Sequence, residues 1–416
     1  MSAPVEQRDA TLAAVRWLRT PEAVRERAGV VLAAAEAGLT PNFAVDPSRL
    51  DDAAETAVQM TRTDYPDLNI PLHSRWRHFE VGRRDRWREC SRRLDHVDRD
   101  EVARIRFDLV IPSVLLDAGA GAAWRWREAS SGELFSRSEG LALASLELFE
   151  RGMLSKHRSR PLRTDAAALR ALDAASLAHV FQVRPDNPLL GLDGRARLLN
   201  RLGAAMELDP GRFGSPARLG HLYDHLKEQA QDGRLPARVL LITLLESLAP
   251  IWPGRIELGG HSLGDVGRHP ATRTDDPTTG LVPFHKLSQW LAYSLIEPLQ
   301  DAGIEVVELN ALTALAEYRN GGLLIDSGVL VPKRGCLLGE AHPGDGEVVV
   351  EWRALTVALI DRLADPVRDR LGLSRAQLPL AKVLQGGTWS AGRSLARQVR
   401  DDGGPPLRII SDGTLF

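Results

Sequence analysis

Cysteine is nearly absent from this chain, which has only Cys90 and Cys336 among its 416 residues. Two cysteines are too few for a disulfide framework, and their separation fits no metal-ligand spacing. Such sparse use of cysteine is typical of proteins that work in a reducing compartment. We therefore expect a cytoplasmic protein.

The chain also lacks long apolar runs and an excess of charge of either sign. No stretch approaches the roughly 18 consecutive apolar residues of a membrane span, and the N-terminus has none of the apolar core of a signal peptide. The 53 basic and 55 acidic residues leave a net charge of −2. Acidic residues also neutralise much of the Arg-rich stretch 72–108. We therefore expect neither nucleic acid nor a membrane as a partner.

Familiar nucleotide-binding and hydrolase motifs are missing or lie in the wrong context. The chain has no Walker loop, and Gly119-x-Gly121 lacks the third glycine and the preceding strand of a dinucleotide site. Residues 260–264 spell the G-x-S-x-G of a nucleophile elbow. They lie in a Gly- and Pro-rich loop with no helix after it, so a serine hydrolase is disfavoured.

Residues 252–280 are rich in Gly, Pro and Asp and predict a long loop, and ordered loops of this length are often functional. His261, Asp265 and His269 recur at four-residue steps, which would bring metal ligands together on a helix. The glycines between them disfavour a helix. We expect no metal and no cofactor, although an amide hydrolase that uses this loop is an alternative.

Helical periodicity is what the chain does contain, and it predicts a mainly α fold with a few short strands. At 416 residues the chain exceeds the usual size of a single domain. We expect an N-terminal helical segment, residues 1–60, packed on one compact body, residues 61–416. The expected elements include helices at 10–18, 24–37, 50–61, 236–248 and 354–371, and strands at 347–352 and in the C-terminal LRIISDGTLF.

Residues 281–330 form the stretch on which the functional argument depends. Large apolar residues recur there at three- and four-residue steps, which predicts a buried helix that Pro283 opens and Pro298 limits. Lys286 falls in the first turn of this helix. The helix macrodipole disfavours a cation at that end.

A second, short helix is expected from Asn310 to Arg319, ending before Gly321. Glu317 would then lie in its last turn, where the macrodipole disfavours an anion. A buried charge needs a partner or a function. Glu317 and Lys286 are therefore candidates for a catalytic pair, and two solvated side chains are the alternative.

An apolar run from Leu109 to Ala123 leads directly into an aromatic and cationic cluster. The next helix starts at the capping box Ser136-x-x-Glu139. Asp117 and the cluster should therefore lie on a loop between two buried helices, a position suited to ligand contacts. A tight turn between packed helices is the alternative.

Long strings of the sequence resemble the URC-pathway uracil-catabolism family, the fourth component of that route, which is described by a domain of unknown function. The resemblance extends from about residue 60 to Phe416. The strings are SVLLDAGAGAAWRWREA, FSRSEGLALASLELF, RPDNPLLGLDGRARLL, GLVPFHKLSQWLAYSLIEPLQDAGIE, LTALAEYRNGGLLIDSGVL, VVVEWRALTVALIDRLA and PLAKVLQGGTWSAGR.

A more distant similarity concerns chemistry. FHKLSQWL, LTALAEYRNGGLLIDSGVL and EVVVEWRALTV resemble, in order and spacing, the queuosine-salvage nucleotide hydrolases, relatives of the helical DNA glycosylases that cleave a base–ribose bond. The lysine of that pattern corresponds to Lys286, and its Asp-Tyr-Arg corresponds to Glu317-Tyr318-Arg319. The similarity implies a large helical domain of the same kind.

Together the resemblances imply hydrolysis of the N-glycosidic bond of ribosylurea, or of its 5-phosphate, to urea and the sugar. Glu317 would stabilise the oxocarbenium-like transition state or activate water, and Lys286, Asp117 or Glu351 would protonate the leaving urea. The alternatives are an amide hydrolase acting on the ring-opened pyrimidine and a noncatalytic partner of the ring-opening enzyme. The expected substrate-binding residues are Trp124, Arg125, Arg127, Trp290, Tyr318, Arg319, Glu351 and Arg353.

Overall fold

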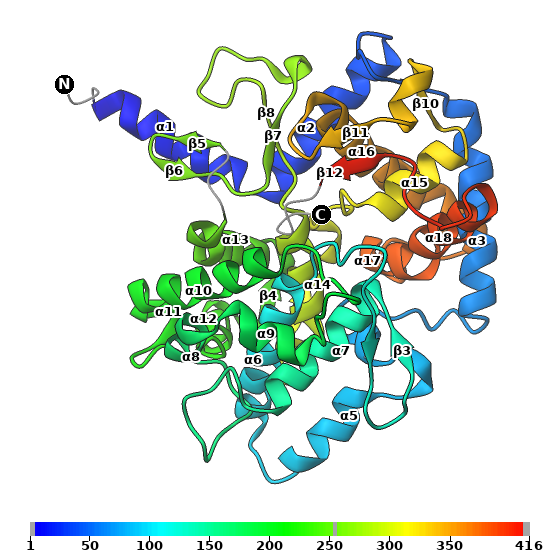
Figure 1. The fold of residues 1–416 in the computed structure, drawn as a ribbon. Coiled ribbons are helices and arrows are strands. Elements are labelled where there is room, and N and C mark those ends of the chain that lie inside the picture. The colour runs from blue at the N-terminus through cyan, green and yellow to red at the C-terminus, as the bar shows by residue number, and fades with distance from the viewer. Residues whose placement is uncertain (1–4, 253–255, 411–416) are drawn as a thin grey trace. The chain divides into compact units, whose positions relative to one another are not determined.

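The computed structural model describes residues 5–252 and 256–410, and helices dominate it (Figure 1). The expected fold class, mainly α with short strands, is confirmed. The described chain divides into two compact units. Unit 1 contains residues 5–73, 256–289 and 308–410, and unit 2 contains residues 74–252 and 290–307. Residues 5–60 belong to unit 1.

Unit 1 combines helices with short paired strands. Its strand pairs are β1–β10, β5–β6 and β7–β8, which are antiparallel, and β11–β12, which is parallel. The elements are α1 (Val5–Leu18), α2 (Pro21–Glu36), β1 (Phe43–Val45), α3 (Leu50–Asp64), β5 (Glu257–Leu258), β6 (His261–Ser262), β7 (Val266–Arg268), β8 (Leu281–Pro283), α15 (Tyr318–Asp326), β10 (Leu330–Pro332), β11 (Ala341–Pro343), α16 (Glu347–Leu371), α17 (Leu380–Val383), a π-helical turn (Leu384–Thr388), α18 (Trp389–Val399) and β12 (Arg408–Ile410).

Unit 2 is more helical still. Its strand pairs are β2–β3, antiparallel, and β4–β9, parallel. Helix α14 (Lys286–Asp301) starts in unit 1 and continues in unit 2. The other elements are α4 (Trp76–Phe79), α5 (Arg86–Ser91), α6 (Arg99–Leu115), β2 (Trp126–Arg127), β3 (Leu134–Phe135), α7 (Arg137–Glu150), α8 (Ala166–Ala171), α9 (Ala174–Val180), α10 (Leu192–Leu208), α11 (Pro210–Phe213), α12 (His221–Gln229), β4 (Arg234–Pro236), α13 (Ala237–Leu248) and β9 (Glu305–Val307).

The helices expected in the first 61 residues are present as α1, α2 and α3. Helix α2 shows why the sequence starts a helix there. The Thr20 side chain accepts a hydrogen bond from Ala23 N at 3.1 Å, and Pro21 occupies the first helical position. A threonine N-cap followed by proline is a strong start signal, because proline has no N–H to leave unsatisfied.

Two local predictions about strands and prolines are wrong. Residues 347–352, expected as a strand, form the first turns of α16. Residues 349–353 are all buried, so packing outweighs the β preference of the valines. Pro298 lies inside α14, which continues to Asp301. The carbonyl of Ser294, which proline cannot bond, accepts Trp76 Nε1 at 2.8 Å instead.

The helix expected from Asn310 to Arg319 is also absent. Only Leu309–Ala311 form a short 3-10 turn, and α15 instead starts at Tyr318 and runs through Gly321 to Asp326. A Cβ on Gly321 would lie 2.6 Å from the Trp352 ring. The glycine therefore permits close packing of α15 on α16 and does not end a helix.

Helices α15 and α18 lie side by side in unit 1, although about 60 residues of chain separate them (Figure 1). A Cβ on Gly392 of α18 would lie 2.1 Å from the backbone oxygen of Arg319 in the first turn of α15. Because the obstacle is backbone, neither helix can relieve the clash by turning a side chain.

Gly392→Ala is therefore expected to lower the free energy of unfolding by about 1–3 kcal/mol, the usual cost of overpacking. Gly29→Ala is the matched control, since Gly29 lies in helix α2 with open space around it. That change should stabilise the protein by up to about 1 kcal/mol through helix propensity. Urea denaturation measures both, and equal effects would contradict the packing argument.

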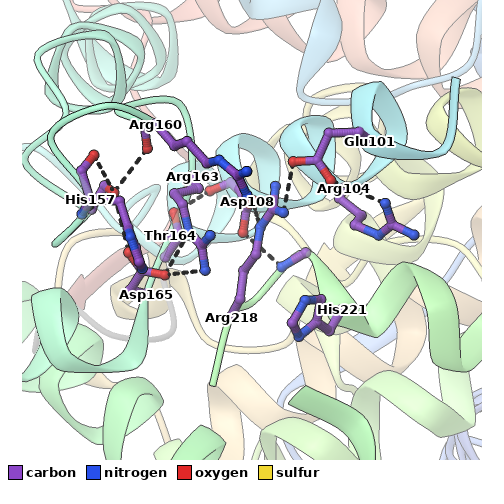
Figure 2. Close-up of polar contacts among 12 residues, drawn as sticks. Glu101, Arg104, Asp108, His157, Arg160, Arg163, Thr164, Asp165, Arg218 and His221 are labelled. Carbon is purple, nitrogen blue, oxygen red and sulfur yellow. Dashed lines mark hydrogen bonds and ion pairs between the residues drawn. The ribbon is translucent and has the colours of Figure 1, made fainter. Parts of the chain in front are cut away.

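In unit 2, Asp108 of α6 anchors two loops (Figure 2). Its Oδ2 accepts Arg218 Nε at 2.8 Å, and its Oδ1 accepts Gly220 N at 2.7 Å. Its backbone oxygen, freed by the proline four residues later, accepts Thr164 Oγ1 at 2.7 Å. Arg218 Nη1 also pairs with Glu101 at 2.7 Å. Asp108 and Arg218 are both buried, so water does not screen the ion pair that joins these loops to α6.

Candidate functional site

Glu317 is the N-cap of α15 and not part of the last turn of a helix, so the sequence-based placement was wrong. Its backbone is extended, and its two carboxylate oxygens accept Asn320 N at 2.5 Å and Arg319 N at 2.7 Å. The residue is 9% exposed. An anion at a helix N-terminus is stabilised by the helix dipole, so the position is favourable for the charged form.

The protonation of Glu317 reflects opposing effects. Burial raises the pKa of Glu317 above its ordinary value. The N–H groups of Arg319 and Asn320 oppose this, and so do the positive charges of Lys286 and Arg319. A carboxyl that burial drives toward the neutral form while cations hold it toward the charged form is suited to proton transfer.

Lys286 is the first residue of α14, as the sequence predicts, and a strained turn precedes it. His285 has a φ of 48°, a left-handed conformation that costs a non-glycine residue on the order of 1–3 kcal/mol. The turn is held because Phe284 N and His285 N both donate to Asp265 O, and Lys286 N donates to Asp265 Oδ2 at 3.0 Å. Strain of this kind often occurs at functional sites.

Arg353 lies near this group but is not a free phosphate clamp. Its Nη1 and Nη2 each lie 2.7 Å from an oxygen of Asp265, and its Nε donates to Ala316 O at 3.4 Å. Burial would raise the pKa of Asp265, but the Arg353 guanidinium and Lys286 N–H hold it below its ordinary value. A buried arginine paired in this way has little capacity left for a substrate.

Tyr318 and Arg319 complete the group in the first turn of α15. The Arg319 guanidinium lies 4.9 Å from the centre of the Tyr318 ring, and its Nη1 donates to Gly403 O at 2.9 Å. Arg319 Nε is buried and has no hydrogen-bond partner among the described residues. Tyr318 is half-buried. Unit 1 therefore brings together Lys286, Glu317, Tyr318, Arg319 and Arg353.

Glu351 belongs to a different group of contacts, which corrects its expected role. It is fully buried, and its oxygens accept Asn42 Nδ2 at 2.8 Å, Phe43 N at 2.7 Å and Asn42 N at 3.2 Å. His269 Nε2 lies 3.4 Å from the same carboxylate. These contacts fix β1 on α16, so Glu351 is occupied in holding the fold and not in protonating urea.

The other predicted residues lie in unit 2. Asp117 Oδ1 pairs with Arg75 Nη1 at 2.9 Å, and its Oδ2 accepts Ser138 Oγ at 3.0 Å. Arg75 is fully buried and also bonds Ser113 Oγ at 2.7 Å. Trp290 packs near the same arginine, with the guanidinium 5.5 Å from its ring centre. Asp117 and Trp290 thus belong to one buried polar cluster around Arg75.

The remaining three residues do not join that cluster. Trp124 is fully buried, its Nε1 donates to Phe181 O at 2.9 Å, and its ring stacks on Phe181, so it is a core residue and no stacking platform for substrate. Arg125 and Arg127 are exposed and bond backbone oxygens of nearby residues. Because both side chains lie on the surface, they do not line an enclosed site for a sugar phosphate.

Two partners of the predicted site residues could not be identified from the sequence: Asp265, which pairs with Arg353, and Arg75, which pairs with Asp117. Asp265 was considered only as a metal ligand, yet it pairs with an arginine 88 positions later. Arg75 lies in an Arg-rich stretch with nothing to distinguish it from its neighbours. No local pattern could have revealed either pairing, because each depends on contacts between segments far apart in sequence.

Three further features hold for the described part of the chain. No group of three or more His, Cys, Asp or Glu side chains there could hold a metal ion. Asp265 and His269 instead face Arg353 and Glu351. No helix among the described residues is long and apolar enough to span a membrane. Cys90 and Cys336 are both free thiols.

Comparison with known proteins confirms the family resemblance. A family model described as "Protein of unknown function (DUF1688)" matches residues 17–416. The chain is 38% identical over 401 residues to "Protein urg3" of Schizosaccharomyces pombe, a match that covers 94% of this chain and 96% of the relative. It is 35% identical over 437 positions to "Uracil catabolism protein 4" of Lachancea kluyveri, covering 97% and 99%. The chain therefore belongs to the DUF1688 family.

Proposed function

We propose that this protein acts in uracil catabolism and hydrolyses the N-glycosidic bond of ribosylurea, or of its 5-phosphate, to urea and the pentose. The printed name of one relative, "Uracil catabolism protein 4", supports the pathway. The observation that carries the reaction is Glu317: a buried carboxyl with a raised pKa, subject to the positive charge of Lys286. Such a pair is suited to an oxocarbenium-like transition state.

Glu317 acts on the sugar side of the reaction. In the transition state the bond from the anomeric carbon to nitrogen breaks, its electron pair moves to the urea nitrogen, and positive charge develops on the sugar. The carboxylate stabilises that charge and accepts a proton from the water that adds to the anomeric carbon. The bonds from Arg319 N and Asn320 N fix its orientation before the substrate arrives.

Lys286 acts on the leaving group. Urea is a poor leaving anion, so its nitrogen or oxygen must receive a proton or a strong hydrogen bond as the bond breaks. The ammonium group of Lys286 supplies either, and its side chain is only partly buried. The bonds of Glu351 to Asn42 and Phe43, and the pairing of Asp117 with Arg75, favour Lys286 as the proton donor.

The pH dependence should report Glu317. Because the carboxylate is the active form, kcat/KM should rise with pH through a pKa above the ordinary glutamate value of about 4.3. In Lys286→Met the cation that lowers this pKa is lost. The rising, acidic limb of the plot of kcat/KM against pH should therefore move to higher pH. Initial rates across pH 4–9 measure the limb, and movement to lower pH would contradict the assignment.

Incubation of the purified protein with synthetic ribosylurea, with and without the 5-phosphate, tests the proposed function. The expected products are intact urea and the pentose. Release of ammonia, or loss of activity on chelation, would point to an amide hydrolase. No turnover of either compound without a partner enzyme would favour a noncatalytic role.

A further inference from the structure

The buried ion pair between Asp265 and Arg353 connects the two sides of the candidate site in unit 1. Asp265 Oδ2 accepts Lys286 N at 3.0 Å as well as Arg353 Nη2 at 2.7 Å. From the same guanidinium, Nε reaches Ala316 O at 3.4 Å, directly before Glu317. We propose that this pair is a positioning device that sets the separation between the Lys286 ammonium and the Glu317 carboxylate.

Asp265 shapes the start of α14. Three consecutive amides donate to this one residue: Phe284 N at 2.9 Å and His285 N at 3.2 Å to its backbone oxygen, and Lys286 N to its carboxylate. These bonds explain how His285 is held at a φ of 48°. The direction in which Lys286 leaves the backbone is therefore determined by Asp265.

Arg353 fixes the other side because its guanidinium cannot turn. Both ends of the planar group bond the two oxygens of Asp265, a bidentate arrangement that defines orientation as well as distance. The Phe284 ring covers the guanidinium at 4.0 Å, and the side chains of the pair are 7% and 5% exposed. Lysine in place of Arg353 would keep the charge and lose this geometry.

The inference rests on the proposed function, and it predicts an effect on the chemical step more than on substrate binding. A displacement of about 1 Å in a catalytic group can reduce the rate on the order of a hundredfold. The charged groups that act on Glu317 are Lys286 of α14 and Arg319 of α15. Loosening the Asp265–Arg353 pair should therefore weaken the effect of Lys286 on the pKa of Glu317 and leave the effect of Arg319 unchanged.

The test is Arg353→Lys, alone and combined with Lys286→Met. We expect kcat to fall at least about tenfold with KM changed less than about threefold, and the pH limb of Glu317 to move to higher pH. In the double variant the effect of Lys286→Met should be smaller than in the wild type, because the two changes act on one arrangement. Additive effects and an unmoved limb would overturn the proposal.

Arg368→Lys is the matched control. Arg368 is buried on the same helix, pairs with Asp365 at 2.8 Å and donates to a backbone oxygen, that of Leu378, at 2.8 Å. It should lose stability without a change in kcat or in the pH limb. If Arg353→Lys does not fold, Asp265→Asn provides the same comparison with the guanidinium intact.

The failure of this inference is distinguishable from the failure of the proposed function. If the wild type releases no urea, the proposed reaction is wrong. Titration of the Glu317 carboxyl by NMR then still tests the Asp265–Arg353 pair, because Arg353→Lys should raise its pKa and Arg368→Lys should not. An unchanged pKa in Arg353→Lys would overturn the positioning role whatever the substrate is.

Discussion

Glu317→Gln is expected to lower kcat for urea release by at least about a hundredfold, typical of the loss of a positioned acid or base. Glutamine keeps one oxygen that can accept a backbone N–H at the start of α15, but it can neither accept the proton of water nor stabilise positive charge on the sugar. Steady-state rates on ribosylurea 5-phosphate measure the change. Wild-type turnover in this variant would remove Glu317 from the mechanism.

The fold of Glu317→Gln should persist. Weakening an N-cap costs about 0.5–2 kcal/mol, and loss of a buried charge offsets part of this, so Tm should fall by only a few degrees. Asp46→Asn is a matched control, because Asp46 is a half-buried acidic N-cap in unit 1 that accepts Ser48 N at 3.0 Å. Its kcat should equal that of the wild type.

Asp108→Ala should have the largest effect on stability, about 3–5 kcal/mol, because it leaves the buried Arg218 without its main counter-charge. The amide of Gly220 and the loop that carries it also lose their anchor on α6. Denaturant unfolding at pH 8, followed by circular dichroism, measures the change. The second variant Asp108→Leu/Arg218→Met should recover much of the loss, because no unpaired buried charge remains.

An exposed pair in the same unit supplies the control. Arg184 and Asp186 pair at 3.1 Å with side chains 65% and 74% exposed. Exposed ion pairs contribute about 0–1 kcal/mol, so Asp186→Ala should be nearly neutral. Equal losses in Asp108→Ala and Asp186→Ala would show that burial does not determine the cost.

The local sequence was informative wherever helix signals are local. Helix α2 starts at a threonine cap followed by proline, and Lys286 lies in the first turn of α14 as its sequence spacing predicts. The sequence also singled out Glu317, but for the wrong reason. A glutamate expected to oppose a helix dipole turned out to cap the next helix, because the two glycines after Arg319 lie inside α15.

The roles that depend on distant contacts could not be predicted. Glu351 and Arg353 are two residues apart on α16, yet one holds β1 and the other pairs with Asp265. Residues two positions apart on an α-helix point to nearly opposite sides of it, because the helix has 3.6 residues per turn. Arg353, and not Glu351, reaches Ala316, the residue before Glu317. This contact depends on how α16 packs against the segments that carry Asp265 and Ala316, and the sequence of none of these segments reveals that packing.

Cleavage of the bond between the anomeric carbon and nitrogen is tested by the position of oxygen-18 after a single turnover of ribosylurea 5-phosphate in labelled water. With immediate borohydride reduction to trap the sugar, we expect label on the former anomeric carbon and unlabelled, intact urea. Label in carbon dioxide or carbamate, together with free ammonia, would mean that water attacks the carbonyl carbon, and the glycosidic mechanism would be wrong.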